Sequence, residues 1–239
     1  MSFSSAAVEA AARPEMPTAW LAGAPSYRDH GPRDGSAVAF PFDDGPGRLT
    51  ARVLDVLAAA GARATFNVLG ERIEGREATL RRVLDEGHEL GNHAFRHESL
   101  AGRPVTALRQ LRATNAAVVR ATGVRPRLFR APYGWVSPGT VRAARLAGLI
   151  TVGWDVDPHD YDAPPATEIR ARVEGAARAG SIVLLHDDRR ALEGTAVALE
   201  GILETLARRG LRCVTAGELL GVTPRVTGGG AAAPPPTPS

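Results

Sequence analysis

The chain has 239 residues, enough for one domain with a buried core, and its 44% hydrophobic and 23% charged residues are the composition of a globular protein. No apolar run approaches the ~20 residues that a membrane-spanning helix needs, so we expect a soluble protein without a membrane segment. The net charge is only +3 and all 29 basic residues are arginines scattered among acids, which argues against nucleic-acid binding and excludes lysine Schiff-base chemistry.

The two ends of the chain differ in composition from the middle. Residues 1–35 are rich in Pro, Ala and Gly and read as an N-terminal lead-in. They lack the cationic start of a secretory signal, and Glu9 and Arg13 interrupt their apolar part, so we expect a cytoplasmic location. Residues 223–239 form a Gly/Ala/Pro-rich tail that we expect to be disordered. The domain itself is expected over 36–222.

Short β-prone runs alternate with Ala/Leu/Arg stretches of helical spacing through this domain. The runs, in chain order, are AVAFPF, RATFNVL, HELGNH, RLFRAP, LITVGWD, SIVLLH and LRCVTA. The helical stretches 49–61, 108–123, 140–148 and 195–210 each end at glycine. This alternation predicts an α/β fold, and seven strands favour a distorted (β/α)7-type barrel of mainly parallel strands. Functional residues then lie where strands end.

The first run ends in FPFDDGP, with Asp43 and Asp44 side by side. Neighbouring side chains of a strand point to opposite faces, so the two carboxylates can serve one site only if the strand stops there. We expect the turn at Gly45 and Pro46 to allow this, although a plain Asp-Gly turn would look the same. Pro41 has no backbone donor, which predicts a local gap or edge in the sheet pairing.

GNHAFRH, after the third run, places His93 and His97 four residues apart, close enough to bind one ion. No Glu follows His93, so this is not the helix of zinc proteases, and any base must come from elsewhere. Two imidazoles and one of the carboxylates Asp43 or Asp44 suit a catalytic zinc with an open position. The same set would also suit Fe(II) in an oxygenase.

Three later runs end in charged residues as well. Arg130 closes RLFRAP, and a rim arginine near Asp43 could hold that carboxylate in place. The acidic stretch GWDVDPHDY includes Asp160, and His186 ends SIVLLH. Each of these motifs has an ordinary structural explanation, but those explanations do not predict that all five fall at successive strand ends. Cys213, the only cysteine, excludes an internal disulfide and a Cys-based zinc site.

The ordered motifs FDDGP, NHAFRH, RAPYG, DVDPHDY and LLHD resemble those of the polysaccharide deacetylases of carbohydrate esterase family 4, the NodB-homology domain. The resemblance covers about residues 36–220. It implies a distorted (β/α) barrel and a metal-dependent amide hydrolase that removes N-acetyl groups from chitin-like or peptidoglycan sugars. The implied cofactor is Zn²⁺, with Co²⁺ or Ni²⁺ as other possible divalent metals.

Carried over position by position, the resemblance implies that Asp43 is the catalytic base. Asp44 would join His93 and His97 on the metal, and Arg130 would orient the base. The chemistry is coherent, because a bound zinc lowers the pKa of water to about 7 and a nearby carboxylate can take the proton as that water attacks an amide carbonyl.

The same resemblance makes His186, tuned by Asp160, the acid that protonates the departing amine. The backbone N–H of Tyr133 would stabilise the oxyanion. Leu184 would shape the acetyl pocket. The residues expected to contact substrate are Tyr133, Tyr161, Leu184 and Trp154.

Three positions depart from the family pattern, which usually has Thr at Pro41, Ser or Thr at Ala94 and Trp at Tyr161. The first substrate hypothesis is an N-acetylglucosamine-type sugar, and the alternative is a small cytosolic N-acylated metabolite or antibiotic precursor. A non-catalytic sugar-binding homologue would keep the metal ligands and lose the base or acid, and neither is lost here. An Fe(II) oxygenase usually has a β-sandwich scaffold, which the alternation of strands and helices contradicts. The sequence does not indicate the oligomeric state.

Overall fold

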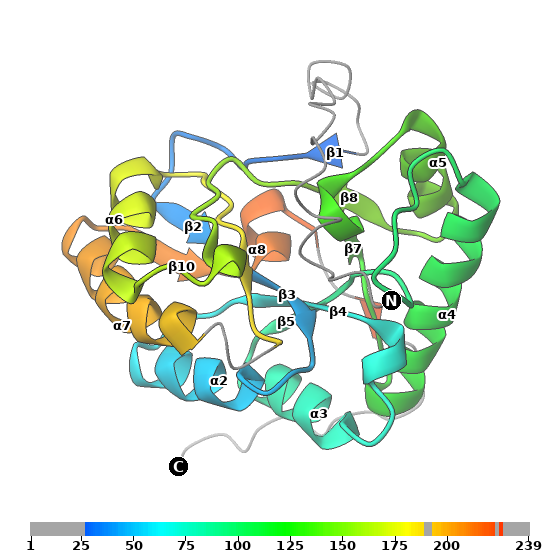
Figure 1. Ribbon diagram of the computed structural model, residues 1–239, viewed down its shortest axis with the longest axis horizontal. Helices are drawn as coiled ribbons and strands as arrows, with labels where there is room; N and C mark the ends of the chain where they lie inside the picture. Colours follow the sequence, from blue (N-terminus) through cyan, green and yellow to red (C-terminus); the bar gives the residue numbers. More distant parts are fainter. Residues whose placement is uncertain (1–26, 189–192, 223–224, 227–239) are drawn as a thin grey trace, which may run out of the picture.

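The computed structural model describes residues 27–188, 193–222 and 225–226. Its main sheet has seven parallel strands in the order β1, β8, β7, β5, β4, β3, β9 (Figure 1). Their bounds are β1 Tyr27–Arg28, β3 Pro41–Gly45, β4 Thr65–Val68, β5 Glu89–Asn92, β7 Leu128–Phe129, β8 Ile150–Val152 and β9 Leu185–His186. The sheet curls, and a single bridge between Val156 and Val183 joins the segment after β8 to the segment before β9. This is the predicted distorted barrel.

Two smaller pairings complete the strands. β2 (Ala37–Ala39) pairs in parallel with β10 (Arg212–Val214), and β6 (Val124–Arg125) pairs antiparallel with β11 (Arg225–Val226). Each of the seven predicted runs therefore contributes a strand, and the two-residue strands β1, β6 and β11 were not predicted. Apart from β11, the predicted tail lies outside the described residues, as do residues 1–26 of the lead-in.

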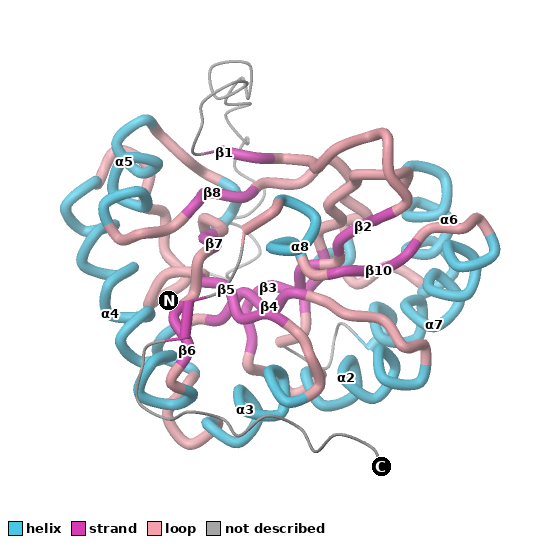
Figure 2. The backbone as a smooth tube through the Cα atoms, turned by 180° about the vertical axis from the view of Figure 1, so that it is seen from behind, coloured by secondary structure: helices cyan, strands magenta, loops and turns pink. Residues whose placement is uncertain are grey.

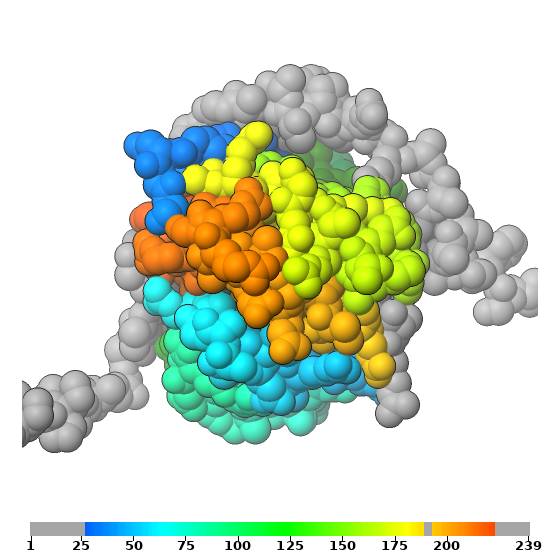
Figure 3. Space-filling model, turned by 90° about the vertical axis from the view of Figure 1, so that its left-hand side faces the viewer, coloured from blue at the N-terminus to red at the C-terminus, as the bar shows by residue number. Residues whose placement is uncertain are grey.

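Helices surround the strands (Figure 2). Their bounds are α2 Thr50–Ala59, α3 Glu77–Asp85, α4 Pro104–Thr122, α5 Pro138–Leu146, α6 Ala166–Ala176, α7 Glu193–Arg208 and α8 Ala216–Leu220, with the short 3-10 turns η2 Gly70–Arg72, η3 Pro132–Gly134 and η4 Asp160–Asp162. Neighbours pack in the order α6, α7, α2, α3, α4, α5, and Figure 3 shows α6 and α7 side by side on one flank. Within the described residues, none of these helices has the length and apolarity to cross a membrane.

The largest part of the core lies between the sheet and α2, α6 and α7. Phe42 and Phe66 stack at 5.4 Å between ring centroids because their strands place them in register. Leu54 and Leu199, from α2 and α7, pack in the same fully buried cluster. Burial of each such side chain stabilises the fold by about 1.5–3 kcal/mol, so this core holds the strand ends in fixed positions.

Residues 27–35, which we assigned to the lead-in, pack on the domain. Tyr27 and Arg28 form the edge strand beside β8. Arg33 forms a 2.7 Å ion pair with Asp155. The domain observed in the structure thus begins several residues before the expected boundary.

Pro41 coincides with an interruption in the sheet, as predicted. Strand structure breaks at Phe40, and pairing with β9 resumes only at Phe42. Ala39 and Asp43 both exchange backbone hydrogen bonds with the β9 side, so the alternation of the strand turns the nitrogen of Pro41 to that side as well. Since this nitrogen carries no hydrogen, one bond of the ladder is missing there.

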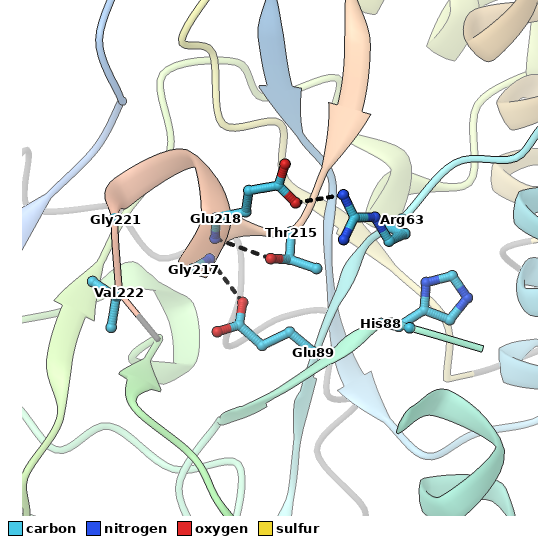
Figure 4. Close-up of a pocket in the computed structure, with 9 residues that line it drawn as sticks. Arg63, His88, Glu89, Thr215, Gly217, Glu218, Gly221 and Val222 are labelled. Atoms are coloured by element: carbon cyan, nitrogen blue, oxygen red, sulfur yellow. Dashed lines mark hydrogen bonds and ion pairs between the residues drawn. The ribbon is translucent and has the colours of Figure 1, made fainter. Parts of the chain in front are cut away.

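Helix α8 closes the N-terminal end of the barrel, remote from the carboxyl ends of the strands. The buried carboxylate of Glu89 accepts a hydrogen bond from Thr65 Oγ1 at 2.7 Å. It accepts a second one from the Gly217 backbone at 2.8 Å (Figure 4). A Cβ at position 217 would lie 2.3 Å from Glu89 Oε1, so only glycine permits this approach. Burial raises the pKa of Glu89 to about 7. An ion pair between Arg63 and Glu218 lies beside it.

Candidate metal centre and catalytic site

Strand β3 brings two adjacent carboxylates to one rim by means of a bulge. Asp43 pairs with Asn67 and Gly45 with Val68, so Asp44 is the extra residue between them. Its φ of 72° lies in the left-handed region, which Asp tolerates better than most residues. We expected the strand to end in a turn at Gly45. The strand instead continues through Gly45, and its irregular residue is Asp44, one position earlier.

Asp44, His93 and His97 offer ligand atoms that all lie within 4.8 Å of one another. Asp44 Oδ1 is buried, has no hydrogen-bond partner among the described residues, and lies 3.3 Å from His93 Nε2 and 3.4 Å from His97 Nε2. His93 donates its Nδ1 hydrogen to the Arg130 carbonyl at 2.8 Å, because a carbonyl can only accept. In a neutral His93, the lone pair of Nε2 therefore faces Asp44, as metal binding requires.

The electrostatics of Asp44 and His97 also fit a divalent cation. Burial alone would raise the pKa of Asp44, but its close contact with His93 and the nearby imidazoles hold that pKa well below its usual range. Burial lowers the pKa of His97 to about 4, so this ring is neutral at pH 7. A carboxylate that stays ionised and a neutral imidazole are the protonation states that bind a metal.

Backbone and side-chain hydrogen bonds brace the loop that carries the two histidines. Ala94 has a φ of 69°, and its N–H donates to Asn92 Oδ1 at 2.8 Å. Asn92 is itself held by the carbonyl of Leu111 and by Asn115 Oδ1. Gln110 Oε1 accepts from the next two backbone N–H groups. This network supports the loop without the hydroxyl that the family usually has at position 94.

Asp43, the predicted base, is buried and receives two donors on one oxygen. Arg130 Nη1 lies 3.3 Å from Asp43 Oδ1, and Asn67 Nδ2 donates to the same oxygen at 2.7 Å. The Arg130 guanidinium is itself held by a 2.7 Å bond to the Gly153 carbonyl and lies 5.5 Å from the centroid of the Trp154 ring. The predicted contact between Arg130 and Asp43 is present, whereas Asn67 was not predicted.

His186, the predicted acid, lies in register with Asp43 on the neighbouring strand. Asp160 holds it with both oxygens: Oδ1 lies 2.7 Å from His186 Nδ1, and Oδ2 accepts from the His186 backbone N–H at 2.9 Å. Thr195, at the start of α7, donates to the same Oδ2 at 2.8 Å. Burial alone would lower the pKa of His186, but the charge and hydrogen bond of Asp160 raise it to about 10, with Asp43 and Asp44 contributing.

The predicted substrate contacts lie at different depths. Tyr133 is 41% exposed and packs edge-on against His97 at 4.4 Å. Tyr161 packs edge-on against His186 at 5.6 Å and hydrogen-bonds to His159 Nδ1 at 2.7 Å. Leu184 is buried directly before strand β9. Tyr133 and Tyr161 thus border a candidate metal ligand and the predicted acid.

Trp154 is partly buried. Its ring packs on Arg130 and beneath Gly134, where a Cβ would come within 2.3 Å of it. This position supports the arginine that contacts Asp43. A contact between Trp154 and substrate stays a prediction.

Comparison with known proteins gives the same identification as the geometry. A family model for polysaccharide deacetylases matches residues 30–152. A peptidoglycan-N-acetylglucosamine deacetylase of Bacillus cereus is 35% identical over 192 residues, covering 79% of this chain and 90% of that protein. A chitooligosaccharide deacetylase of Sinorhizobium fredii is 39% identical over 162 residues, covering 65% and 75%.

Solved structures share the fold. The crystal structure of a peptidoglycan N-acetylglucosamine deacetylase superposes with a TM-score of 0.82 at 31% identity, covering 87% of this chain and 98% of that one. A family 4 acetyl xylan esterase of Clostridium thermocellum, in complex with a cobalt ion, gives a TM-score of 0.74 at 36% identity, covering 78% and 93%. Sequence, fold and ligand geometry agree, and the chain belongs to the polysaccharide deacetylase family, carbohydrate esterase family 4.

Proposed function

We propose that the protein is a zinc-dependent N-deacetylase that hydrolyses the acetamide of an N-acetylglucosamine-type sugar to an amine and acetate. The observation that carries the proposal is the pairing of Asp43 with His186 on neighbouring strands, beside the set of Asp44, His93 and His97. A carboxylate and an imidazolium on opposite sides of a reacting amide supply the base and the acid that its hydrolysis needs.

In the proposed reaction Asp43 takes the proton of the attacking water. Its Oδ1 is held by Arg130 and Asn67, which keeps the carboxylate oriented. His186 carries a proton at neutral pH because Asp160 raises its pKa, and it delivers that proton to the departing nitrogen. The backbone N–H of Tyr133 is proposed to stabilise the oxyanion.

Asp44, His93 and His97 are the residues that would hold the metal. A bound zinc would supply Lewis-acid polarisation of the acetyl carbonyl and a water of lowered pKa. Zinc suits a donor set of two imidazoles and one carboxylate. Cobalt is the other candidate, since a related family 4 esterase was solved in complex with a cobalt ion.

The choice of a sugar substrate is supported by the relatives, which include deacetylases of peptidoglycan and of chitooligosaccharides. The exposed Tyr133 and the partly buried Tyr161 at the rim suit stacking against a sugar ring. A small N-acylated metabolite is the alternative, and our expectation of a cytoplasmic location favours it. A screen of N-acetyl sugars, oligomers and metabolites by mass spectrometry separates the two.

The decisive experiment replaces the base. Asp43→Asn is expected to lower the rate of acetate release by about 10²–10⁴-fold while bound metal, measured by elemental analysis, stays at the wild-type content. Asp34→Asn, at an exposed position, is the control and is expected to retain activity. Wild-type activity in Asp43→Asn would refute the role of Asp43, and metal binding without turnover on any N-acetyl substrate would identify a binding protein instead.

A further inference from the structure

We propose that Asn67 is a positioning residue for Asp43: it fixes one carboxylate oxygen of the base so that the other oxygen, Oδ2, receives the proton. The inference rests on the proposed role of Asp43 and adds to it a residue from strand β4. It assigns a task to a buried polar side chain that has no place in the motifs of the sequence.

The placement of Asn67 needs an explanation, because asparagine is depleted in strands and a buried amide is costly unless it forms hydrogen bonds. Asn67 is only 3% exposed and lies in the middle of β4. Its amide nitrogen lies 2.7 Å from Asp43 Oδ1, a short distance for this type of bond. The orientation of the amide follows from its partner, because an ionised carboxylate can only accept.

The alignment of three neighbouring strands makes this contact. Asp43 pairs with Asn67 across β3 and β4, and Asn67 pairs with Gly91 across β4 and β5. A Cβ at position 91 would lie 2.0 Å from Asn67 Oδ1. Gly91 therefore leaves the space that the Asn67 side chain occupies, and the amide is held against the base from behind.

Asn67 and Arg130 act on the same oxygen. Arg130 supplies a positive charge at 3.3 Å and Asn67 a neutral donor at 2.7 Å. Because both donors occupy Oδ1, Oδ2 is the oxygen left to accept the proton of the attacking water. A neutral amide achieves this without placing a second cation beside the metal ligand Asp44.

Asn67→Leu, which keeps the size and removes the donor, tests the proposal. Displacing a reacting group by about 1 Å can lower the rate about 10²-fold. We therefore expect kcat to fall 10- to 100-fold, with KM and metal content within about threefold of wild type. Asn67→Asp places a second carboxylate against the base and is expected to lose at least as much. Thr151→Val is the control, because it removes a buried hydroxyl of β8 that has no hydrogen-bond partner among the described residues.

The outcomes separate this inference from the proposed function. If Asp43→Asn is inactive while Asn67→Leu retains wild-type kcat, the role of Asn67 is refuted and the function stands. A crystal structure of the metal-loaded Asn67→Leu variant gives a readout that needs no substrate. We expect the Asp43 carboxylate to rotate or to occupy several orientations, and an unchanged single orientation overturns the proposal. Asn67→Ala serves for both measurements if the leucine variant does not fold.

Discussion

At the scale of single residues, Asp160 determines the charge of His186. Burial favours a neutral imidazole, and the Asp160 carboxylate reverses this preference. As the proposed acid, His186 should be active below its raised pKa and lose its proton as the pH rises through that value. A divalent cation on Asp44 would repel the imidazolium and bring the pKa closer to neutrality.

Asp160→Asn is expected to lower the pKa of His186, because burial then dominates. The alkaline limb of the profile of kcat/KM against pH should move to lower pH by at least about one unit, equivalent to about 1.4 kcal/mol. Thr195→Val removes one of the donors to Asp160 and should shift the limb less. If the alkaline limb of the Asp160→Asn profile stays at the same pH as in the wild type, another group is the acid.

The sequence predicts the proposed base, acid and metal ligands better than the residues that hold them in place. Asp43, His93 and His186 stand in recognisable motifs at strand ends. Asn67 and Thr195 become neighbours of Asp43 and Asp160 only in the folded chain, at separations of 24 and 35 residues. A single asparagine or threonine carries no spacing signal, so these residues are found only from coordinates.

At the scale of elements, Thr50, the first residue of helix α2, connects the segment after Asp43 and Asp44 to the end of strand β9. Thr50 Oγ1 donates to Asp187 Oδ2 at 2.5 Å and accepts from the Gly47 backbone at 2.8 Å. The Asp187 backbone N–H in turn donates to the carbonyl of Asp43. Burial raises the pKa of Asp187 to about 7. These hydrogen bonds hold strand β3, which carries Asp43, against strand β9, which carries His186.

Thr50→Val, which removes the hydroxyl at nearly constant volume, should destabilise the fold by about 1–2 kcal/mol and lower kcat/KM about tenfold. Thr50→Ser keeps the hydroxyl and should remain close to wild type in both respects. Denaturant unfolding and steady-state kinetics measure the two effects. Equal behaviour of the valine and serine variants would contradict a role for this hydrogen bond.

Glu89, under helix α8, makes stability depend on pH. Its pKa in the folded protein, about 7, lies above the ordinary 4.5, so the folded state binds the proton more tightly. The stabilisation is complete below pH 4.5 and is lost as the pH rises to about 7, by roughly 3 kcal/mol in total. We expect Glu89→Gln to flatten this part of the stability profile in denaturant unfolding. An unchanged slope between pH 4.5 and 7 would show that Glu89 titrates normally.

Helices α2, α4, α5 and α7 match predicted stretches, whereas strands β1, β6 and β11 were not predicted. Helix α4 begins at Pro104 and ends before Gly123 in the left-handed conformation, both recognisable signals. β1, β6 and β11 have two residues each, too few for a periodic pattern. The bulge at Asp44 was missed because its sequence also fits an ordinary turn.

At the scale of the whole molecule, the metal is expected to stabilise the fold as well as to support the reaction. Removal by a chelator should abolish acetate release and lower Tm, because a ligand that binds only the folded state at 100 times its Kd stabilises by about 2.7 kcal/mol. Adding zinc should restore both. Asp44→Asn should show little response of Tm to zinc, and a zinc-dependent rise of wild-type size would place the ion elsewhere.

The closure of the barrel has a consequence for motion. Strands β3, β4 and β5 are joined by ladders of several residues, whereas the bridge between Val156 and Val183 is a single pair. Asp160 comes shortly after Val156 in the chain, whereas Asp43, His186 and the candidate metal ligands lie on or directly after the paired strands β3, β5 and β9. Opening motions of the barrel should therefore begin at this single bridge and move Asp160 relative to His186, while the set of Asp44, His93 and His97 stays in place.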